Sequence, residues 1–421
     1  MRHRFVRTVL LVLLFAAGVF GHYLLPFQLG PVTIYLYRLV VIFLVGLFLY
    51  ARGRAGFMGT FQIGLPRRVL VVMAMWVTWG LFSILWSPDP LNGCREVIEL
   101  CFGTMVLGCM SLLIGKQERG LGALRAGWAT AVLCAGLVAV WELWTGQHLK
   151  SGFIDAASPW VLKGMATVST FGNPNNFGSF LLMALPFIAW GVEEARSWAL
   201  RIFGLAFLLG MACLIIITGS RLCLAGSLVL GIIWAVCTFK GRARPLALLG
   251  LVLIVVCMII GLVMFKPMIG VKLLSAQSEM GGQATGTSGN TRIHLYLDSI
   301  YLTLTSFGFG IGAGGFNQRL TYGYLPWATD GITSPHNFFL EILSQYGVLV
   351  FAGFAWWMIG CWRSFKAKWR TETRHGAGFW GICCMVAYGF AALANSGFLN
   401  QQSNWLFLGS LFVMSRKDSH G

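Results

Sequence analysis

The chain has very little charge for its length. Of its 421 residues only 11% are charged, whereas 57% are hydrophobic, and the mean hydropathy is +0.74. A soluble domain typically carries about 25% charged residues, so this chain cannot cover a surface that faces water. The shortage of charge predicts a protein that uses lipid as its solvent.

Further absences narrow the possible chemistry. No nucleotide-binding glycine motif is present, and the long segments between the apolar runs contain neither a cysteine nor a cluster of acidic residues. Nine of the eleven cysteines fall inside apolar runs, where they are expected to act as small packing residues. Divalent ions usually require Asp or Glu ligands. We therefore expect no disulfide, no metal site and no cofactor.

The apolar runs are long enough to cross a membrane. The hydrocarbon core is roughly 30 Å thick and needs about 20 apolar residues per helical crossing. The sequence predicts an all-α bundle of about 12 transmembrane helices, divided into a membrane domain at 1–265, an outer loop with short helices at 266–342 and a second membrane domain at 343–421. The expected spans are 5–24, 33–50, 69–86, 97–115, 121–144, 176–192, 198–217, 222–239, 246–265, 343–362, 379–398 and 403–415.

The basic residues predict the orientation of this bundle. With the N-terminus in the cytoplasm, 22 of the 31 Lys and Arg fall on the cytoplasmic side, eight fall outside and Arg38 lies within a span. This bias follows the positive-inside rule, and an even number of spans places both termini in the cytoplasm. The formal charge of +17 is then explained by orientation and contact with anionic membrane lipids, and no nucleic-acid partner is needed.

Two outer segments are too long to be simple connections, at about 145–175 and 266–342. The second segment contains a candidate amphipathic helix with Ile293, Leu297, Ile300 and Leu304 at helical spacing, followed by a glycine-rich stretch at 307–317. A further helix is expected to begin with Ser334 as its N-cap and Pro335 at its first position, which places His336 in the first turn.

Five short motifs, taken together with their order along the chain, resemble the O-antigen ligase and polymerase superfamily of bacterial envelopes. They are TGSR (218–221), FGNPNNFGSFLLMALP (171–186), NTR (290–292), GFGIGAGGFN (308–317) and PHNFFLEILSQYG (335–347). The resemblance covers most of residues 165–350. It implies an inner-membrane enzyme that moves a glycan from undecaprenyl diphosphate to an acceptor at the periplasmic face, without a metal or a nucleotide.

The resemblance also implies which residues act. Arg221, Arg292 and His336 match the functional positions of the family. Arginine stays charged and grips phosphate oxygens with two donors at once, which suits binding of the leaving diphosphate. Histidine suits removal of the acceptor hydroxyl proton near neutral pH. Further candidates for substrate binding are Arg38, Asn175, Asn337 and Arg319.

Each of these residues also has a structural alternative. Arg221 can reach toward lipid phosphates, Arg292 can be a solvated loop residue, and His336 can cap a helix. Arg38 can extend from its span to the interface or face a cavity. Asn173, Asn175 and Asn176, around Pro174, can shape and cap the start of the sixth span.

The leading function is an O-antigen ligase that transfers a glycan to the lipid A core. Within the same superfamily, a polymerase and a protein O-oligosaccharyltransferase remain open, because they share the donor and differ in the acceptor. A transporter of lipid-linked glycans is the alternative from another class. Transporters tend to have charges in the middle of the membrane and repeats between their halves. Here Arg38 is the only residue that we interpret as a strong charge within the membrane, and no clear repeat is found.

Overall fold

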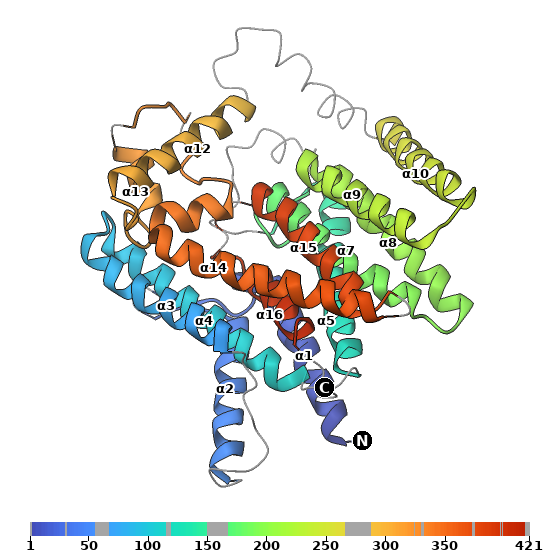
Figure 1. The fold of residues 1–421 in the computed structure, drawn as a ribbon, viewed down its shortest axis with the longest axis horizontal. Helices are drawn as coiled ribbons and strands as arrows, with labels where there is room; N and C mark the ends of the chain where they lie inside the picture. The colour runs from blue at the N-terminus through green and yellow to red at the C-terminus, as the bar shows by residue number, and fades with distance from the viewer. Residues whose placement is uncertain are drawn as a thin grey trace. The chain divides into compact units, whose positions relative to one another are not determined.

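The protein is built almost entirely of α-helices (Figure 1). A computed structural model describes residues 2–29, 32–54, 67–114, 119–149, 167–265, 288–323, 325–329, 332–372, 375–395, 397 and 399–416. The helices are α1 (Arg2–Phe20), α2 (Leu36–Arg54), α3 (Arg67–Ser83), α4 (Pro90–Ile114), α5 (Arg119–Thr145), α7 (Pro174–Glu193), α8 (Trp198–Thr218), α9 (Arg221–Thr238), α10 (Ala243–Phe265), α12 (Ser288–Thr305), α13 (Phe316–Tyr322), α14 (Phe338–Thr371), α15 (Ala377–Ala394) and α16 (Gln402–Met414).

Short elements complete the description. Two 3-10 turns, η1 (Gly21–Tyr23) and η2 (Ile84–Trp86), follow α1 and α3. The strands β1 (Phe27–Leu29) and β2 (Val32–Ile34) form an antiparallel hairpin, with Phe27 opposite Ile34.

Each of the twelve predicted spans coincides with a helix, and the all-α membrane bundle is confirmed. Among the described residues, ten helices are long and apolar enough to cross a membrane. The helices at the second and twelfth predicted spans are shorter: the apolar part of α2 is Leu36–Tyr50, and α16 has 13 residues. The limits of two spans differ from the prediction, because α4 already begins at Pro90 and α14 begins at Phe338 and extends over 34 residues, with a kink at Gly347.

The chain folds into two compact units, each built from separate stretches of the sequence. Unit 1 comprises residues 1–131, 288–381 and 396–421, and unit 2 comprises 132–287 and 382–395. In unit 1, α16 packs on α4 and α1, α14 packs on α3 and α12, and α2 packs on α1 and α4. In unit 2, α7 packs on α8 and α9, and α10 packs on α8 and α9.

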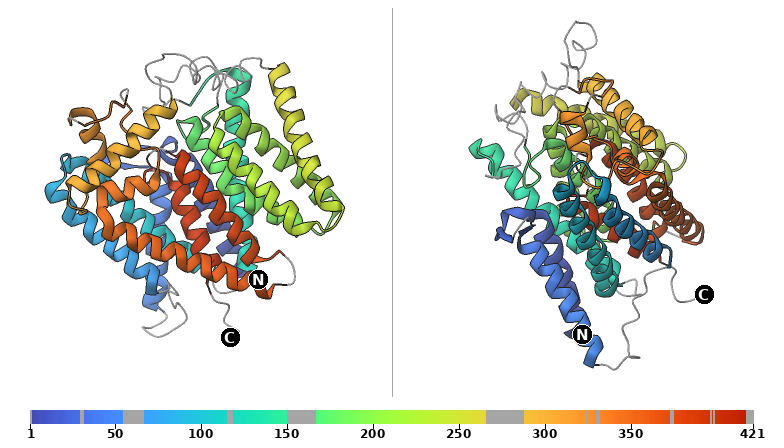
Figure 2. Two further views of the ribbon diagram at one scale, coloured as in Figure 1. Left: turned by 45° about the horizontal axis from the view of Figure 1, so that its top comes forward. Right: turned by 90° about the vertical axis from the view of Figure 1, so that its left-hand side faces the viewer.

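The first residues of α1 and the last residues of α16 lie on one side of unit 1. Gln402 at the start of α16 lies against Gly21 just after α1, so these two helices run in opposite directions. At the other end of α16, the guanidinium of Arg416 donates to the carbonyl of Ser111 near the end of α4, at 3.3 Å. Figures 1 and 2 show α12 and α13 at the opposite end of this unit, beside the start of α14.

Candidate functional site

His336 lies immediately before α14, in a backbone conformation that is rare for a side-chain-bearing residue. Its φ is 48°, in the left-handed region. The N-cap of α14 is Asn337, whose side-chain oxygen accepts from the amides of Phe339 at 3.1 Å and Leu340 at 3.3 Å. The predicted N-cap at Ser334 and the predicted place of His336 in the first turn are therefore wrong. The helix begins three residues later because Asn337 satisfies its first free amides.

The imidazole of His336 is set up to remain neutral. Its Nδ1 atom is buried and makes no hydrogen bond within the described part of the chain. Burial, and to a smaller extent the nearby guanidinium of Arg292, lower the pKa of His336 to about 4. Both effects disfavour the charged ring. A neutral ring is able to accept a proton, and the main cause is burial rather than the helix end expected from the sequence.

Arg292 lies on α12, near His336. This helix packs against α14, and Arg292 lies half-buried near its start. Arg292 and His336, which are 44 positions apart in the sequence, are thus neighbours in space, as the electrostatic effect on the His336 pKa requires. The structure brings together two of the three residues that the motifs singled out as catalytic.

The helix predicted around Arg292 is confirmed, and its apolar face is largely exposed. Ile293 is 55% exposed, Ile300 44% and Leu304 70%, so the predicted apolar face points away from the protein. Helical spacing identifies an apolar face without saying whether protein or lipid covers it, and a helix at a membrane surface turns its apolar side toward lipid. The face that is buried in unit 1 is mostly polar and contains Thr291, Leu295, Asp298, Ser299 and Leu302.

The glycine-rich segment fixes the start of α14 beside the other helices of unit 1. The amide of Ile311 donates to the carbonyl of Ser344 at 2.8 Å, and the amide of Val348 donates to the carbonyl of Gly308 at 2.9 Å. Gly347 interrupts α14 with a φ of 80°, and a Cβ there would lie 2.3 Å from the carbonyl oxygen of Gly308. Only glycine allows the two backbones to approach this closely.

A buried carboxylate anchors the same segment from α4. Glu96 accepts from the amide of Gly314 at 3.1 Å and from the hydroxyl of Tyr346 at 3.0 Å. The indole of Trp86 donates to the carbonyl of Gly310 at 2.9 Å. The glycine-rich turns predicted from the sequence are confirmed, and their backbone hydrogen bonds join α12 and α13 to the helices that hold His336.

In unit 2, Arg221 lies at a tight turn between two helices. Gly219 ends α8 with a φ of 66°, Ser220 precedes α9, and Arg221 is the first residue of α9. The Arg221 side chain is exposed, and the described residues give it no hydrogen bond or ion pair. This leaves its guanidinium available to an anionic ligand.

Asn175 stands near this turn at the start of α7. The side chain of Asn173 accepts from the Asn175 amide at 2.8 Å, and Pro174 occupies the first helical position, as the sequence indicated for this cap. Three residues further on, a Cβ at Gly178 would lie 3.1 Å from the Thr218 hydroxyl oxygen. The start of α7 is therefore packed against the turn that carries Arg221.

The remaining candidates, Arg38 and Arg319, differ in their burial and in their side-chain contacts. Arg38 is buried, forms an ion pair with Glu99 and donates to the Thr33 carbonyl at 2.7 Å. Its guanidinium also lies over the rings of Tyr35 and Phe102. Arg319 is exposed on α13. In the described residues no group of three His, Cys, Asp or Glu side chains could hold a metal ion.

Asp298 and Glu142 are further buried acidic residues, besides Glu96, that were not identified from the sequence. Asp298 on α12 is fully buried, and this burial raises the pKa of its carboxyl group. Glu142 near the end of α5 is also buried and accepts several hydrogen bonds. For Glu142, the signal was an acidic residue within an apolar run, which is costly unless it has partners.

The comparisons with known proteins agree with the motifs. A family model described as O-antigen ligase matches residues 205–355, the stretch that contains Arg221, Arg292 and His336. The teichuronic acid biosynthesis protein TuaE of Bacillus subtilis (strain 168) is 25% identical over 393 residues, which are 90% of this chain and 78% of that protein. The resemblance to the O-antigen ligase superfamily is confirmed, and it agrees with the ten apolar helices of a multi-pass membrane protein among the described residues.

Proposed function

We propose that this protein is an O-antigen ligase, which transfers a glycan from undecaprenyl diphosphate to the lipid A core at the periplasmic face of the bacterial inner membrane. The observation that carries the proposal is the neutral, buried imidazole of His336 next to the cationic Arg292. A proton acceptor beside a fixed positive charge is the pair that glycosyl transfer from a diphosphate requires. The match to the O-antigen ligase model supports the same reaction.

The reaction assigns a role to each group. The acceptor hydroxyl oxygen attacks the anomeric carbon, the bond from this carbon to the diphosphate breaks, and the diphosphate leaves with the electron pair. His336 takes the hydroxyl proton, while Arg221 and Arg292 bind the diphosphate through paired N–H donors. This needs no metal ion. We further propose that Arg319 and Asn175 contact substrate, and that Arg38 and Asn337 shape the site through the partners described above.

A glycan polymerase is the second candidate. The relative from Bacillus subtilis is named for the biosynthesis of teichuronic acid, and such a role in this chain would join glycan units to each other instead of to lipid A core. The site chemistry is the same, since only the acceptor changes.

The envelope glycans of a deletion strain distinguish these candidates. A ligase predicts that long chains disappear from lipid A core while lipid-linked long chains accumulate. A polymerase predicts core that carries a single repeat. Unchanged glycans in the deletion strain would contradict both, and loss of glycan without any transfer by the purified protein would favour a transporter.

The proposed orientation has its own test in unit 1. Tyr322, which is 78% exposed on α13, and Arg370, which is exposed near the end of α14, lie on opposite sides of the membrane if α14 crosses it once. In a background without the exposed Cys94 and Cys257, Tyr322→Cys should react with an impermeant thiol reagent added outside spheroplasts, whereas Arg370→Cys should not. Labelling of Arg370→Cys alone would reverse the proposed orientation.

A further inference from the structure

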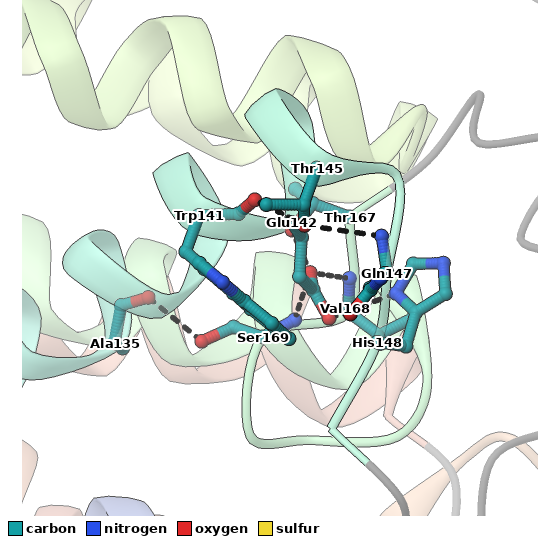
Figure 3. Close-up of polar contacts among 9 residues, drawn as sticks. All are labelled: Ala135, Trp141, Glu142, Thr145, Gln147, His148, Thr167, Val168 and Ser169. Carbon is teal, nitrogen blue, oxygen red and sulfur yellow. Dashed lines mark hydrogen bonds and ion pairs between the residues drawn. The ribbon is translucent and has the colours of Figure 1, made fainter.

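Glu142 joins the two ends of the outer segment between α5 and α7. Figure 3 shows its carboxylate among hydrogen-bond donors from both sides of this segment. One oxygen, Oε1, accepts from Nδ1 of His148 at 2.8 Å, just after α5. The other, Oε2, accepts from the amides of Val168 at 3.0 Å and Ser169 at 2.8 Å, and from the hydroxyl of Thr167. These last three residues lead toward α7.

The hydrogen bonds around Glu142 require both of its carboxylate oxygens to act as acceptors. All four groups around Glu142 are donors, and the Glu142 side chain is only 1% exposed. A buried donor that loses its acceptor has no water to replace it. Glutamine at this position would place an NH₂ group against donors and leave at least one of them unsatisfied.

The residues held by Glu142 are fixed further by their own contacts. Ser169 has a φ of 50°, and its hydroxyl donates to the Ala135 carbonyl on α5 at 2.7 Å. Phe171 then stacks on Phe177 and Phe180 in the first turns of α7, with ring centroids 5.7 and 4.8 Å away. The position of Ser169 therefore determines where α7 begins.

The start of α7 in turn supports the turn that carries Arg221. A Cβ at Gly178 would lie 3.3 Å from the Ser220 Cβ and 3.2 Å from the Cys223 sulfur. Ser220 and Cys223 lie on either side of Arg221 in the sequence. Cys223 is fully buried in this contact. A shift of the start of α7 would open this contact and move the backbone of Arg221.

We propose that Glu142 is a positioning residue for Arg221, acting through residues 167–169 and the start of α7. The inference rests on the proposed role of Arg221 in binding the donor diphosphate. It predicts that Glu142 sets the affinity for the lipid-linked donor and has little effect on the chemical step, because it acts on Arg221 and not on the base.

The experiment compares Glu142→Gln with Glu193→Gln in the full-length protein. Glu193 accepts from the indole of Trp234 at 2.6 Å at the other end of α7, so its substitution also removes an acceptor from unit 2. Two quantities are measured: the rate of Cys223 alkylation, followed by peptide mass spectrometry, and the KM and kcat for an undecaprenyl-diphosphate-linked glycan. Thr167→Val, which removes one donor and keeps the carboxylate, serves if Glu142→Gln does not accumulate.

In Glu142→Gln, Cys223 alkylation and the donor KM should each rise by about 10-fold or more, with kcat nearly unchanged. Thr167→Val should shift both in the same direction by less, and Glu193→Gln should match the wild type. A protected Cys223, an unchanged KM, or equal effects in Glu142→Gln and Glu193→Gln would overturn the proposal. If the wild type transfers no glycan, the proposed function fails, while the Cys223 measurement still decides whether Glu142 holds the start of α7.

Discussion

Replacing His336 with alanine is expected to lower the rate of glycan transfer by about 10²–10⁴-fold, the usual cost of a lost general base. Binding of the lipid-linked donor should be unchanged, because the phosphate contacts are assigned to arginines. The measurement is paired: donor binding and turnover of the purified variant at matched expression. His375→Ala is the matched control, since His375 stacks on Phe379 beyond the end of α14.

A second substitution separates the base from the backbone. His336 has a left-handed φ of 48°, which asparagine adopts more easily than alanine. His336→Asn therefore keeps the local conformation and a hydrogen-bonding side chain but cannot act as a base near neutral pH. It should be as inactive as His336→Ala. Wild-type turnover in His336→Asn would remove the histidine from the mechanism and leave it a structural role before α14.

The same account predicts the pH dependence of the wild type. Because burial and Arg292 lower the pKa of His336 to about 4, the neutral form that accepts a proton is present above this pH. kcat/KM should stay level as pH falls from 8 to 5 and drop near 4. In Arg292→Ala, the drop should move toward higher pH, since one of the two causes of the lowered pKa is removed.

Substitution of the two arginines should weaken donor binding. Removing a charged hydrogen-bond partner typically costs about 1.5–3 kcal/mol, so Arg221→Ala and Arg292→Ala should each weaken binding of the lipid-linked donor by about 10-fold or more. Lysine keeps the charge but loses the two-donor fork, so each Arg→Lys variant should retain intermediate affinity and some turnover.

The control for both positions is Arg95→Ala, which removes an exposed arginine near the start of α4. It should bind donor like the wild type, because the account gives Arg95 no contact with the diphosphate. Wild-type donor binding in both Arg221→Ala and Arg292→Ala would remove the arginines from the site. An equal loss of donor affinity in Arg95→Ala would show that any positive charge on the outer side of the protein favours donor binding.

The membrane fold was predictable because it depends on composition and length. Apolar runs of about 20 residues have few alternatives to a helix in lipid, and each predicted span coincides with a helix. Exact limits were less predictable. Residues 90–96 lay outside the predicted span, which began at 97, yet they belong to α4, and Glu96 is buried against partners within unit 1.

The site was only partly predictable for a related reason. The motifs identified His336 and Arg292, but the left-handed backbone of His336 depends on capping by Asn337, which competes with the equally plausible cap at Ser334. The outward apolar face of α12 depends on lipid, which spacing alone does not distinguish from a protein core. The hydrogen bonds of Glu142 join positions up to 27 residues apart and leave no local pattern.

The most direct test of the central claim is transfer by the purified protein in proteoliposomes. The mixture contains an undecaprenyl-diphosphate-linked glycan, a lipid A core acceptor and EDTA, with His336→Asn measured in parallel. The account predicts that the wild type forms glycosylated core in the presence of EDTA and that His336→Asn forms almost none. Absence of product from the wild type, product that requires added magnesium or manganese, or equal product from His336→Asn would contradict it.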